Sequence, residues 1–328
     1  MRIAIVTASA FALAAVACGN PSTDKNVDNA IDERAALLPT PANGLALVMP
    51  VDKVIPAGGD QMWCWVPELP AGALAADQLV VHADGAQGAG GHHVFVYMSA
   101  IPRKAGDVFD CTNVEEMVTM TPLLAPVTAS SPTFGKTLPP GYAIRMPKDA
   151  TLVVQSHYVN VKDQAIRIKD NVTLTYADPG ADVVEAAYWT QSLTDFSIPE
   201  GEHSITTTCQ MQGDLAALSV LGHMHEWGKN FSFTVTPAAG GDAAPIYSVP
   251  DWTAQYRDSP PLTVYPEGQP LVMHDGDTLT MTCAYNNDTG ADLKFPFEMC
   301  TTFGAYAPAR PDGFVLCDST GENLDLGL

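Results

Sequence analysis

The chain carries few positively charged residues and little charge of either sign. Lys and Arg together number 16 against 37 Asp and Glu, and charged residues make up only 16% of the 328 positions. The resulting formal net charge of −21 repels phosphate backbones, so nucleic acid is excluded as an expected partner. The 46% hydrophobic content excludes a mostly disordered chain and is sufficient for sizeable cores.

Two further features are missing. The sequence has no CxxC pair, so a thioredoxin-like site or a zinc ribbon is not expected. Beyond the N-terminal segment, no window of a dozen residues has a convincing hydrophobic period of 3.6, which argues against amphipathic helices. Gly and Pro are abundant instead, at 26 each, and they separate short β-rich stretches. This pattern predicts an all-β fold, and the length suggests two domains.

The N-terminal segment has the features of a bacterial export signal. Arg2 precedes an apolar stretch that is too short to span a bilayer comfortably, and the segment ends Ala15-Val16-Ala17-Cys18, which resembles a lipobox. We therefore predict that residues 1–17 are removed and that Cys18 is lipidated, with the lipid as the only membrane attachment. Because no Asp follows Cys18, the periplasmic side of the outer membrane, or the cell surface, is favoured. The alternative is an ordinary secretory peptide cut nearby.

The cysteine count agrees with export. If Cys18 takes lipid, an even number remains, which in an exported chain suggests three disulfides. The six can pair in 15 ways, and the count does not choose among them. These residues are Cys64, Cys111, Cys209, Cys283, Cys300 and Cys317. Residues 18–44 are rich in Asn, Asp, Pro, Ser and Thr, and we predict that they form a flexible tether.

A repeat divides the remaining chain. Six identities recur at a constant offset of 127 positions, from Gly141, Met146, Thr151-Leu152, Tyr158 and Asn160 to Gly268, Met273, Thr278-Leu279, Tyr285 and Asn287. A shorter motif, Ile55-Pro56-Ala57-Gly58, recurs as Ile198-Pro199-Glu200-Gly201. We predict a duplicated β-sandwich domain with a boundary near Asp182, so that the domains span residues 45–182 and 183–328.

Five of the eight histidines fall in three clusters, namely His92-His93, His157 and His223-Met224-His225. Alternate side chains of a strand share a face, so His223 and His225 can bind one ion while Met224 points into the core. His92 and His93 are consecutive, so they can bind one ion only if the backbone turns there, which Gly90-Gly91 would permit. Each cluster alone also fits histidines that merely pack or lie at the surface.

The repeat makes a metal site in each domain more plausible and suggests the type of metal. His157 aligns with Ala284, so a three-ligand site in the second domain needs a donor other than this histidine. Imidazole and thioether ligands without thiolate suit copper, because Met binds Cu(I). The spacing does not identify which of the twelve methionines would serve.

These segments together resemble the copper type II, ascorbate-dependent monooxygenases, the family of the peptidylglycine alpha-hydroxylating and dopamine beta-monooxygenases. The matching segments occur in family order and cover most of residues 45–328. They are His92-His93-Val94, Gln155-Ser156-His157-Tyr158, His223-Met224-His225 with Gly228-Lys229, and Glu298-Met299-Cys300. The resemblance implies two tandem jelly-roll-like β-sandwich domains with one copper ion each.

The resemblance also implies roles for individual residues. His92, His93 and His157 would hold the electron-transfer copper, and His223, His225 and Met299 would hold the oxygen-activating copper. The family pattern suggests the disulfides Cys64–Cys111, Cys209–Cys317 and Cys283–Cys300. The last bridge would pin the methionine strand against the strand bearing Ala284, the position for which Met299 would substitute.

The expected chemistry is hydroxylation of a C–H bond of a small organic substrate by O2, with ascorbate or another reductant as electron donor. The family residues that hold a peptide carboxylate are replaced here by Leu221, Thr301 and Phe303, so an uncharged or cationic substrate is expected. Trp227 would line the pocket or simply pack. The rival hypotheses are an exported copper carrier without turnover and a purely structural double sandwich.

Overall fold

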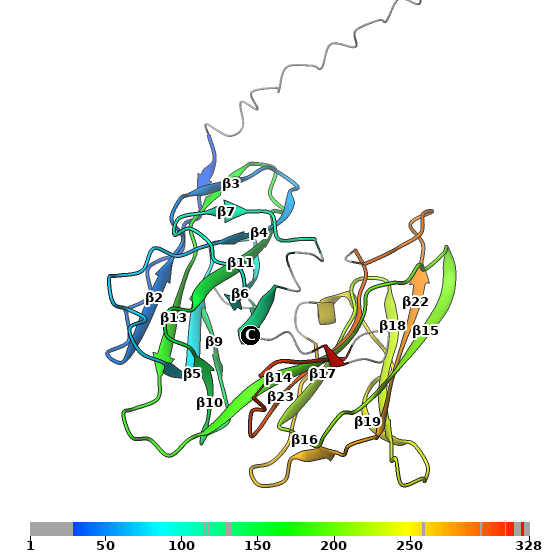
Figure 1. Ribbon diagram of the computed structural model, residues 1–328. Helices are drawn as coiled ribbons and strands as arrows, with labels where there is room; N and C mark the ends of the chain where they lie inside the picture. Colours follow the sequence, from blue (N-terminus) through cyan, green and yellow to red (C-terminus); the bar gives the residue numbers. More distant parts are fainter. Residues whose placement is uncertain are drawn as a thin grey trace, which may run out of the picture.

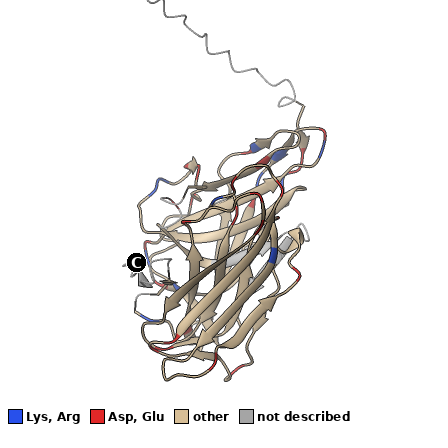
Figure 2. Cartoon of the chain, turned by 90° about the vertical axis from the view of Figure 1, so that its right-hand side faces the viewer, with Lys and Arg blue, Asp and Glu red and all other residues tan. Residues whose placement is uncertain are grey.

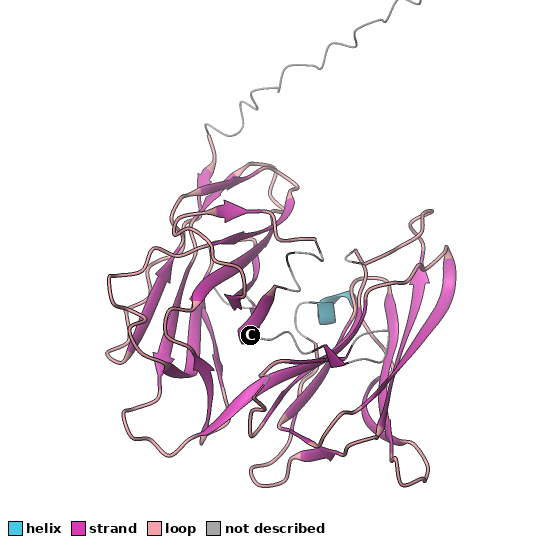
Figure 3. Ribbon diagram, in the orientation of Figure 1, coloured by secondary structure: helices cyan, strands magenta, loops and turns pink. Residues whose placement is uncertain are grey.

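The computed structural model describes residues 29–113, 116, 119–128, 133–257, 260–295, 297–311, 313–317 and 323–324. The fold is all-β, as predicted, and the helix η1 (Ala254–Arg257) forms a single turn (Figure 3). Within these ranges no helix is long and apolar enough to cross a membrane. The predicted signal peptide and the predicted lipidation site Cys18 lie outside the described residues.

The first sandwich packs a sheet of order β7-β4-β11-β6-β8 against strands of order β2-β13-β5-β10, with β9 beside β5 and a small sheet β1-β12-β3 at one end (Figure 1). Trp63, Trp65 and Tyr158 from one layer and Leu47 and Leu174 from the other are buried between the layers. The strands are β1 Ile31–Asp32, β2 Gly44–Val48, β3 Lys53–Ile55, β4 Asp60–Trp65, β5 Gln78–Ala86, β6 Gly91–Ser99, β7 Val108–Phe109, β8 Met120–Thr128, β9 Thr133–Thr137, β10 Tyr142–Met146, β11 Thr151–Val159, β12 Ile166–Ile168 and β13 Asn171–Tyr176.

The second sandwich packs a sheet of order β15-β22-β18-β19 against strands of order β14-β23-β16-β21, to which β17, β20, β24 and β25 are also paired. Its core includes Trp189, Phe231, Phe233 and Tyr306. The strands are β14 Val184–Leu193, β15 Gly201–Gln210, β16 Leu215–Ala217, β17 Ser219–His223, β18 Gly228–Thr236, β19 Ala244–Val249, β20 Thr263–Val264, β21 Leu271–Met273, β22 Thr278–Asn287, β23 Cys300–Tyr306, β24 Val315–Cys317 and β25 Asn323–Leu324.

The two sandwiches share one continuous sheet. Strand β10 of the first pairs in parallel with β14 of the second, and β14 begins two residues after the predicted boundary. Leu218, Ala305 and Phe314 of the second sandwich pack into the first hydrophobic core. The domains are therefore joined through backbone hydrogen bonds and apolar packing rather than only by a linker.

The end of the predicted tether is part of the first domain, which differs from the prediction. Strand β1 pairs in parallel with β12, and the backbone N–H of Glu33 donates to the carbonyl of Arg167 at 2.8 Å. The N–H of Leu38 donates to Oδ1 of Asn171 at 2.9 Å. Composition missed this because backbone hydrogen bonds at a sheet edge do not require apolar side chains.

The predicted repeat has a structural counterpart. In the first domain Asn160, just after β11, donates from Nδ2 to the carbonyl of Ile55 at 3.2 Å. In the second domain Asn287, at the end of β22, donates to the carbonyl of Ile198 at 2.8 Å. Both asparagines thus fasten the Ile-Pro motif of their own domain, and β11 corresponds to β22.

The three disulfides pair as the family pattern suggested. They are Cys64–Cys111, Cys209–Cys317 and Cys283–Cys300, with Cα–Cα distances of 5.7, 6.1 and 5.9 Å. The last two each join the two layers of the second sandwich, from β15 to β24 and from β22 to β23. Three disulfides indicate an oxidising, exported environment.

In the view of Figure 2 the acidic residues lie mainly in loops.

Candidate metal centres

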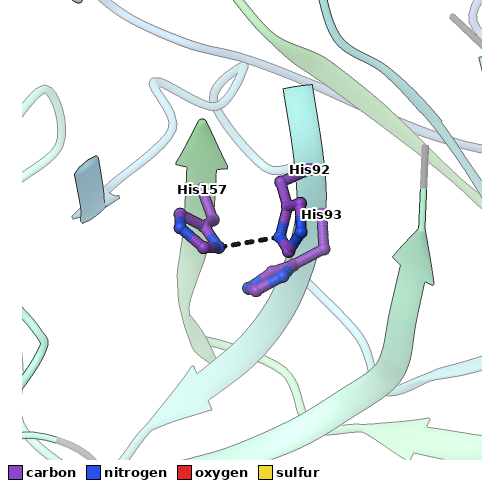
Figure 4. A group of neighbouring side chains, drawn as sticks. All are labelled: His92, His93 and His157. Atoms are coloured by element: carbon purple, nitrogen blue, oxygen red, sulfur yellow. Dashed lines mark hydrogen bonds between the residues drawn. The ribbon is translucent and has the colours of Figure 1, made fainter. Parts of the chain in front are cut away.

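The first centre is built by a β-bulge. Strands β6 and β11 are antiparallel neighbours in which His93 lies opposite His157, but the next pair joins Gly91 to Tyr158, so His92 is an extra residue in β6. Gly90, just before this bulge, has φ of +87°, a conformation that glycine adopts without strain. The bulge lets two consecutive histidines face His157, and all three rings converge (Figure 4).

The three predicted ligands of the first centre lie close enough for one ion. One nitrogen from each of His92, His93 and His157 falls within 4.8 Å of the others. The Nδ1 atoms of His92 and His157 are 2.9 Å apart. Since metal–imidazole bonds are about 2.0–2.1 Å in zinc sites, small adjustments of the three side chains would place all three nitrogens around one ion.

A carboxylate orients the third ligand. Nε2 of His157 donates to Oδ1 of Asp60 at 2.6 Å, which turns Nδ1 of His157 towards the other two histidines. This hydrogen bond is the main cause that lowers the pKa of Asp60 below its usual value. Desolvation, followed by the nearby charges of His157, His92 and His223, holds the pKa of His93 well below its usual value. A neutral His93 is the form that binds a metal.

The histidines of the second centre lie at the end of β17 and in the turn after it. His223 ends the strand, and the ring centroids of His223 and His225 are 5.1 Å apart. Met224 between them is fully buried in the core, as predicted. His225 donates from Nδ1 to the carbonyl of Phe297 at 2.9 Å, which leaves Nε2 as the ring nitrogen that can bind a metal.

Glu298 ties together the two segments that carry the predicted ligands. Its fully buried carboxylate accepts the backbone N–H of His225, of Trp227 at 3.4 Å and of Met299 at 2.8 Å. Burial is the main cause that raises the pKa of Glu298 to about 7, and the three N–H donors oppose that rise. Tyr285 also donates its hydroxyl to the carbonyl of Met299 at 2.8 Å. The main chain of Met299 is therefore held in place beside the His225 segment.

Met299 and Ala284 lie in facing layers of the second sandwich. Ala284, which aligns with His157, lies in β22, whereas Met299 immediately precedes β23 in the opposite layer. That Met299 supplies the donor missing at Ala284 stays a prediction, and it would do so from the layer opposite β22. The Cys283–Cys300 bridge does join the two strands, and it holds the segment of Met299 against β22.

The two histidine sets lie near each other across the domain junction. Arg257 of η1 places Nη2 2.9 Å from Nε2 of His92 and forms an ion pair with Glu226, the residue after His225. The charge of His223 contributes to the lowered pKa of His93. The electrostatic environment of the first centre therefore depends on residues of the second domain.

The residues that stand where the resembling family holds a peptide carboxylate lie beside His223. In the pairing of β17 with β23, Leu221 is opposite Phe303 and His223 is opposite Thr301. The ring of Phe303 is 6.4 Å from that of His223. Trp227 packs against the second core and donates from Nε1 to Asp288 at 3.1 Å, which fits the packing alternative for this residue.

Three contributing residues were not identified from the sequence. Asp60 lies on the strand next to His157, and only the strand register could reveal it. Glu298 was part of a family segment, but no role was assigned to it. Arg257 is one of only 16 basic residues and follows Trp252 and Tyr256, which is a weak signal.

No family model and no curated protein matches the chain. Among solved structures it is similar to the major capsid protein P2 of bacteriophage PM2, at 9% identity and TM-score 0.32 over 80% of this chain and 98% of that chain. It is also similar to a structure of Broad Bean Stain Virus, at 9% identity and TM-score 0.30 over 88% and 94%. The PBSX exported protein XepA matches at 10% identity and TM-score 0.24 over 82% and 89%. These scores are too low to support an inference about function.

Proposed function

We propose that the chain is an exported copper-dependent monooxygenase. It would insert one atom of O2 into a C–H bond of a small organic substrate, while the other atom leaves as water with two electrons and two protons from a reductant such as ascorbate. The observation that carries the proposal is the presence of two unlike candidate ligand sets near each other in one chain. A carrier needs a binding site but has no need of two different ones.

The donor atoms of both centres fit copper. Bound copper would supply one-electron redox chemistry and affinity for O2. At the first centre, His92, His93 and His157 offer imidazole nitrogens alone, with Asp60 holding the orientation of His157. At the second centre, His223 and His225 offer imidazoles, and Met299 would add the thioether that favours Cu(I).

The surroundings of the second centre favour a substrate without a negative charge. Leu221, Thr301 and Phe303 offer no cation beside His223, and the chain as a whole is strongly acidic. A substrate carboxylate would find no cation among these residues, so an uncharged or cationic molecule with an activated C–H bond is favoured. We place this chemistry outside the cytoplasm, with the protein anchored by lipid on Cys18, and Cys18→Ala should move it from the membrane fraction to the soluble fraction.

Copper stoichiometry and oxygen consumption test the proposal together. We expect two copper ions per chain, O2 uptake that needs ascorbate and rises with a suitable substrate, and incorporation of label from ¹⁸O2 into the product. Two copper ions that show no redox cycling with ascorbate would favour an exported copper carrier instead. Absence of bound copper would leave only the structural double sandwich.

A further inference from the structure

A chain of hydrogen-bonded side chains runs from the second domain into the first centre. Nη2 of Arg257 is 2.9 Å from Nε2 of His92, Nδ1 of His92 is 2.9 Å from Nδ1 of His157, and Nε2 of His157 is 2.6 Å from Oδ1 of Asp60. On its other side Arg257 is paired with Glu226. The chain thus links a carboxylate of each domain through two candidate metal ligands.

Arg257 determines where the protons of this chain lie. A guanidinium only donates hydrogen bonds, so Nε2 of His92 accepts and the single proton of a neutral His92 is on Nδ1. That proton is donated to Nδ1 of His157, whose own proton is therefore on Nε2 and is donated to Asp60. Each hydrogen bond has one donor and one acceptor, so the assignment is self-consistent.

His92 cannot bind a metal in this arrangement. Its Nδ1 carries a proton, and the lone pair of its Nε2 faces Arg257. A metal at Nε2 would take the lone pair that Arg257 uses. A metal at Nδ1 would move the imidazole proton to Nε2. Two N–H groups, one on His92 and one on Arg257, would then face each other and could not form a hydrogen bond. The contact with Arg257 and coordination by His92 therefore exclude each other.

We propose that Arg257 is a positioning residue that senses the metal state of the first centre. It holds η1 against His92 when the metal is absent, and it is released when the metal binds. The inference depends on the proposed function only for the identity of the ion, since any metal that His92 coordinates would have this effect. Loading of the first centre would thereby change the contact between the domains beside the second centre.

The test compares Arg257→Ala with Arg34→Ala, which removes the same charge from an exposed ion pair with Asp32. In a His223→Ala/His225→Ala background, zinc(II) would be titrated against a competing chelator. Loss of one charge-assisted hydrogen bond that competes with the metal should raise zinc affinity about tenfold in Arg257→Ala, and Arg34→Ala should match the background. Equal affinities in Arg257→Ala and the background would overturn the proposal.

Two measurements without turnover separate this role from a general effect of charge. Nitrogen NMR of the metal-free protein should show His92 protonated on Nδ1, and Arg257→Ala should lose that preference. Hydrogen–deuterium exchange of η1 should rise when zinc binds to the wild type, whereas metal-free Arg257→Ala should already show the faster exchange. A His92 protonated on Nε2 in the metal-free wild type would contradict the inference. Because neither measurement uses O2 or a reductant, failure to find monooxygenase activity would leave these results standing.

Discussion

The two sandwiches have different chemistry at corresponding places. In the first domain Asn171, at the start of β13, pairs with Ala86 at the end of β5; in the second, Thr301 near the start of β23 pairs with His223 at the end of β17. The repeated tyrosine marks the same corner in both domains. Tyr158 donates to Asp170 just before β13, and Tyr285 donates to Met299 just before β23.

This corner holds a closed polar network in the first domain. Asp170 is fully buried and accepts hydrogen bonds from Ser156 at 2.6 Å, from Tyr158 at 2.5 Å and from Gln87 at 3.2 Å. In the second domain the same corner carries the proposed His-Met centre. The first domain instead places its histidines on β6 and β11, whose counterparts β18 and β22 have Asn230 and Ala284 paired at the matching point. A duplicated frame has thus acquired its candidate ligands at two different positions.

If the two centres are independent, each can be emptied alone. His157→Ala should remove the first copper ion and Met299→Ala should weaken or remove the second, so that each variant keeps about one ion. Metal analysis after dialysis measures the stoichiometry, and loss of a copper–sulfur signal in X-ray absorption would identify Met299. His203→Ala, at a partly exposed histidine of β15, is the control. Loss of both ions from either variant would contradict independent sites.

Removing one disulfide from either domain should lower the free energy of unfolding. Only removal of the disulfide in the second domain should also affect the second centre. By the loop-closure estimate, replacing Cys64 and Cys111 with Ala should cost about 4 kcal/mol and replacing Cys283 and Cys300 about 3 kcal/mol. Urea unfolding measures both. Only the Cys283/Cys300 variant should also bind copper less tightly at the second centre, because that bridge holds the segment of Met299. Unchanged affinity there would show that Glu298 alone is sufficient.

The polar network of the first domain should make stability depend on pH. Burial is the main cause that raises the pKa of Asp170 to about 6 from 3.8, so the folded state keeps a proton that the unfolded chain loses. The free energy of unfolding should therefore fall by about 3 kcal/mol as the pH rises from about 4 to 6. Asp170→Asn should remove this part of the fall and leave the part due to Glu298, whose pKa of about 7 acts over an overlapping pH range, and the exposed Asp163→Asn should keep both parts. Chemical denaturation at a series of pH values decides between these outcomes.

The carboxylates that support the two centres should act locally. Glu298→Gln replaces one acceptor oxygen by a donor facing backbone N–H groups, and it should lower copper affinity at the second centre about 10- to 100-fold. Asp60→Asn should do the same at the first centre, because it weakens the hydrogen bond that orients His157. Competition titrations in variants that retain one centre measure each effect. An equal loss at both centres in either variant would indicate general destabilisation.

Local patterns in the sequence were sufficient to predict the fold class and the two related domains. Gly and Pro between short β-rich stretches predicted the all-β fold, and the 127-residue offset predicted two related domains whose asparagines and tyrosines do occupy matching places. The grouping of His223 with His225 was predicted from the alternation of a strand, although only His223 lies in a strand, and that of His92 with His93 from the glycines before them. The disulfide pairing came from the family resemblance, because the count of six cysteines leaves 15 possibilities.

Only the tertiary structure decided how these groups are connected. The register of β4 against β11 brings Asp60 to His157, the bulge in β6 brings His92 there, and layer packing places Met299 immediately before β23, opposite the strand of Ala284. Arg257 reaches His92 from 165 residues away through the domain junction. Alternation and turn residues are local properties that a single chain segment displays. Register, the burial of Glu298 and contacts between domains depend on distant segments that meet only when the chain folds.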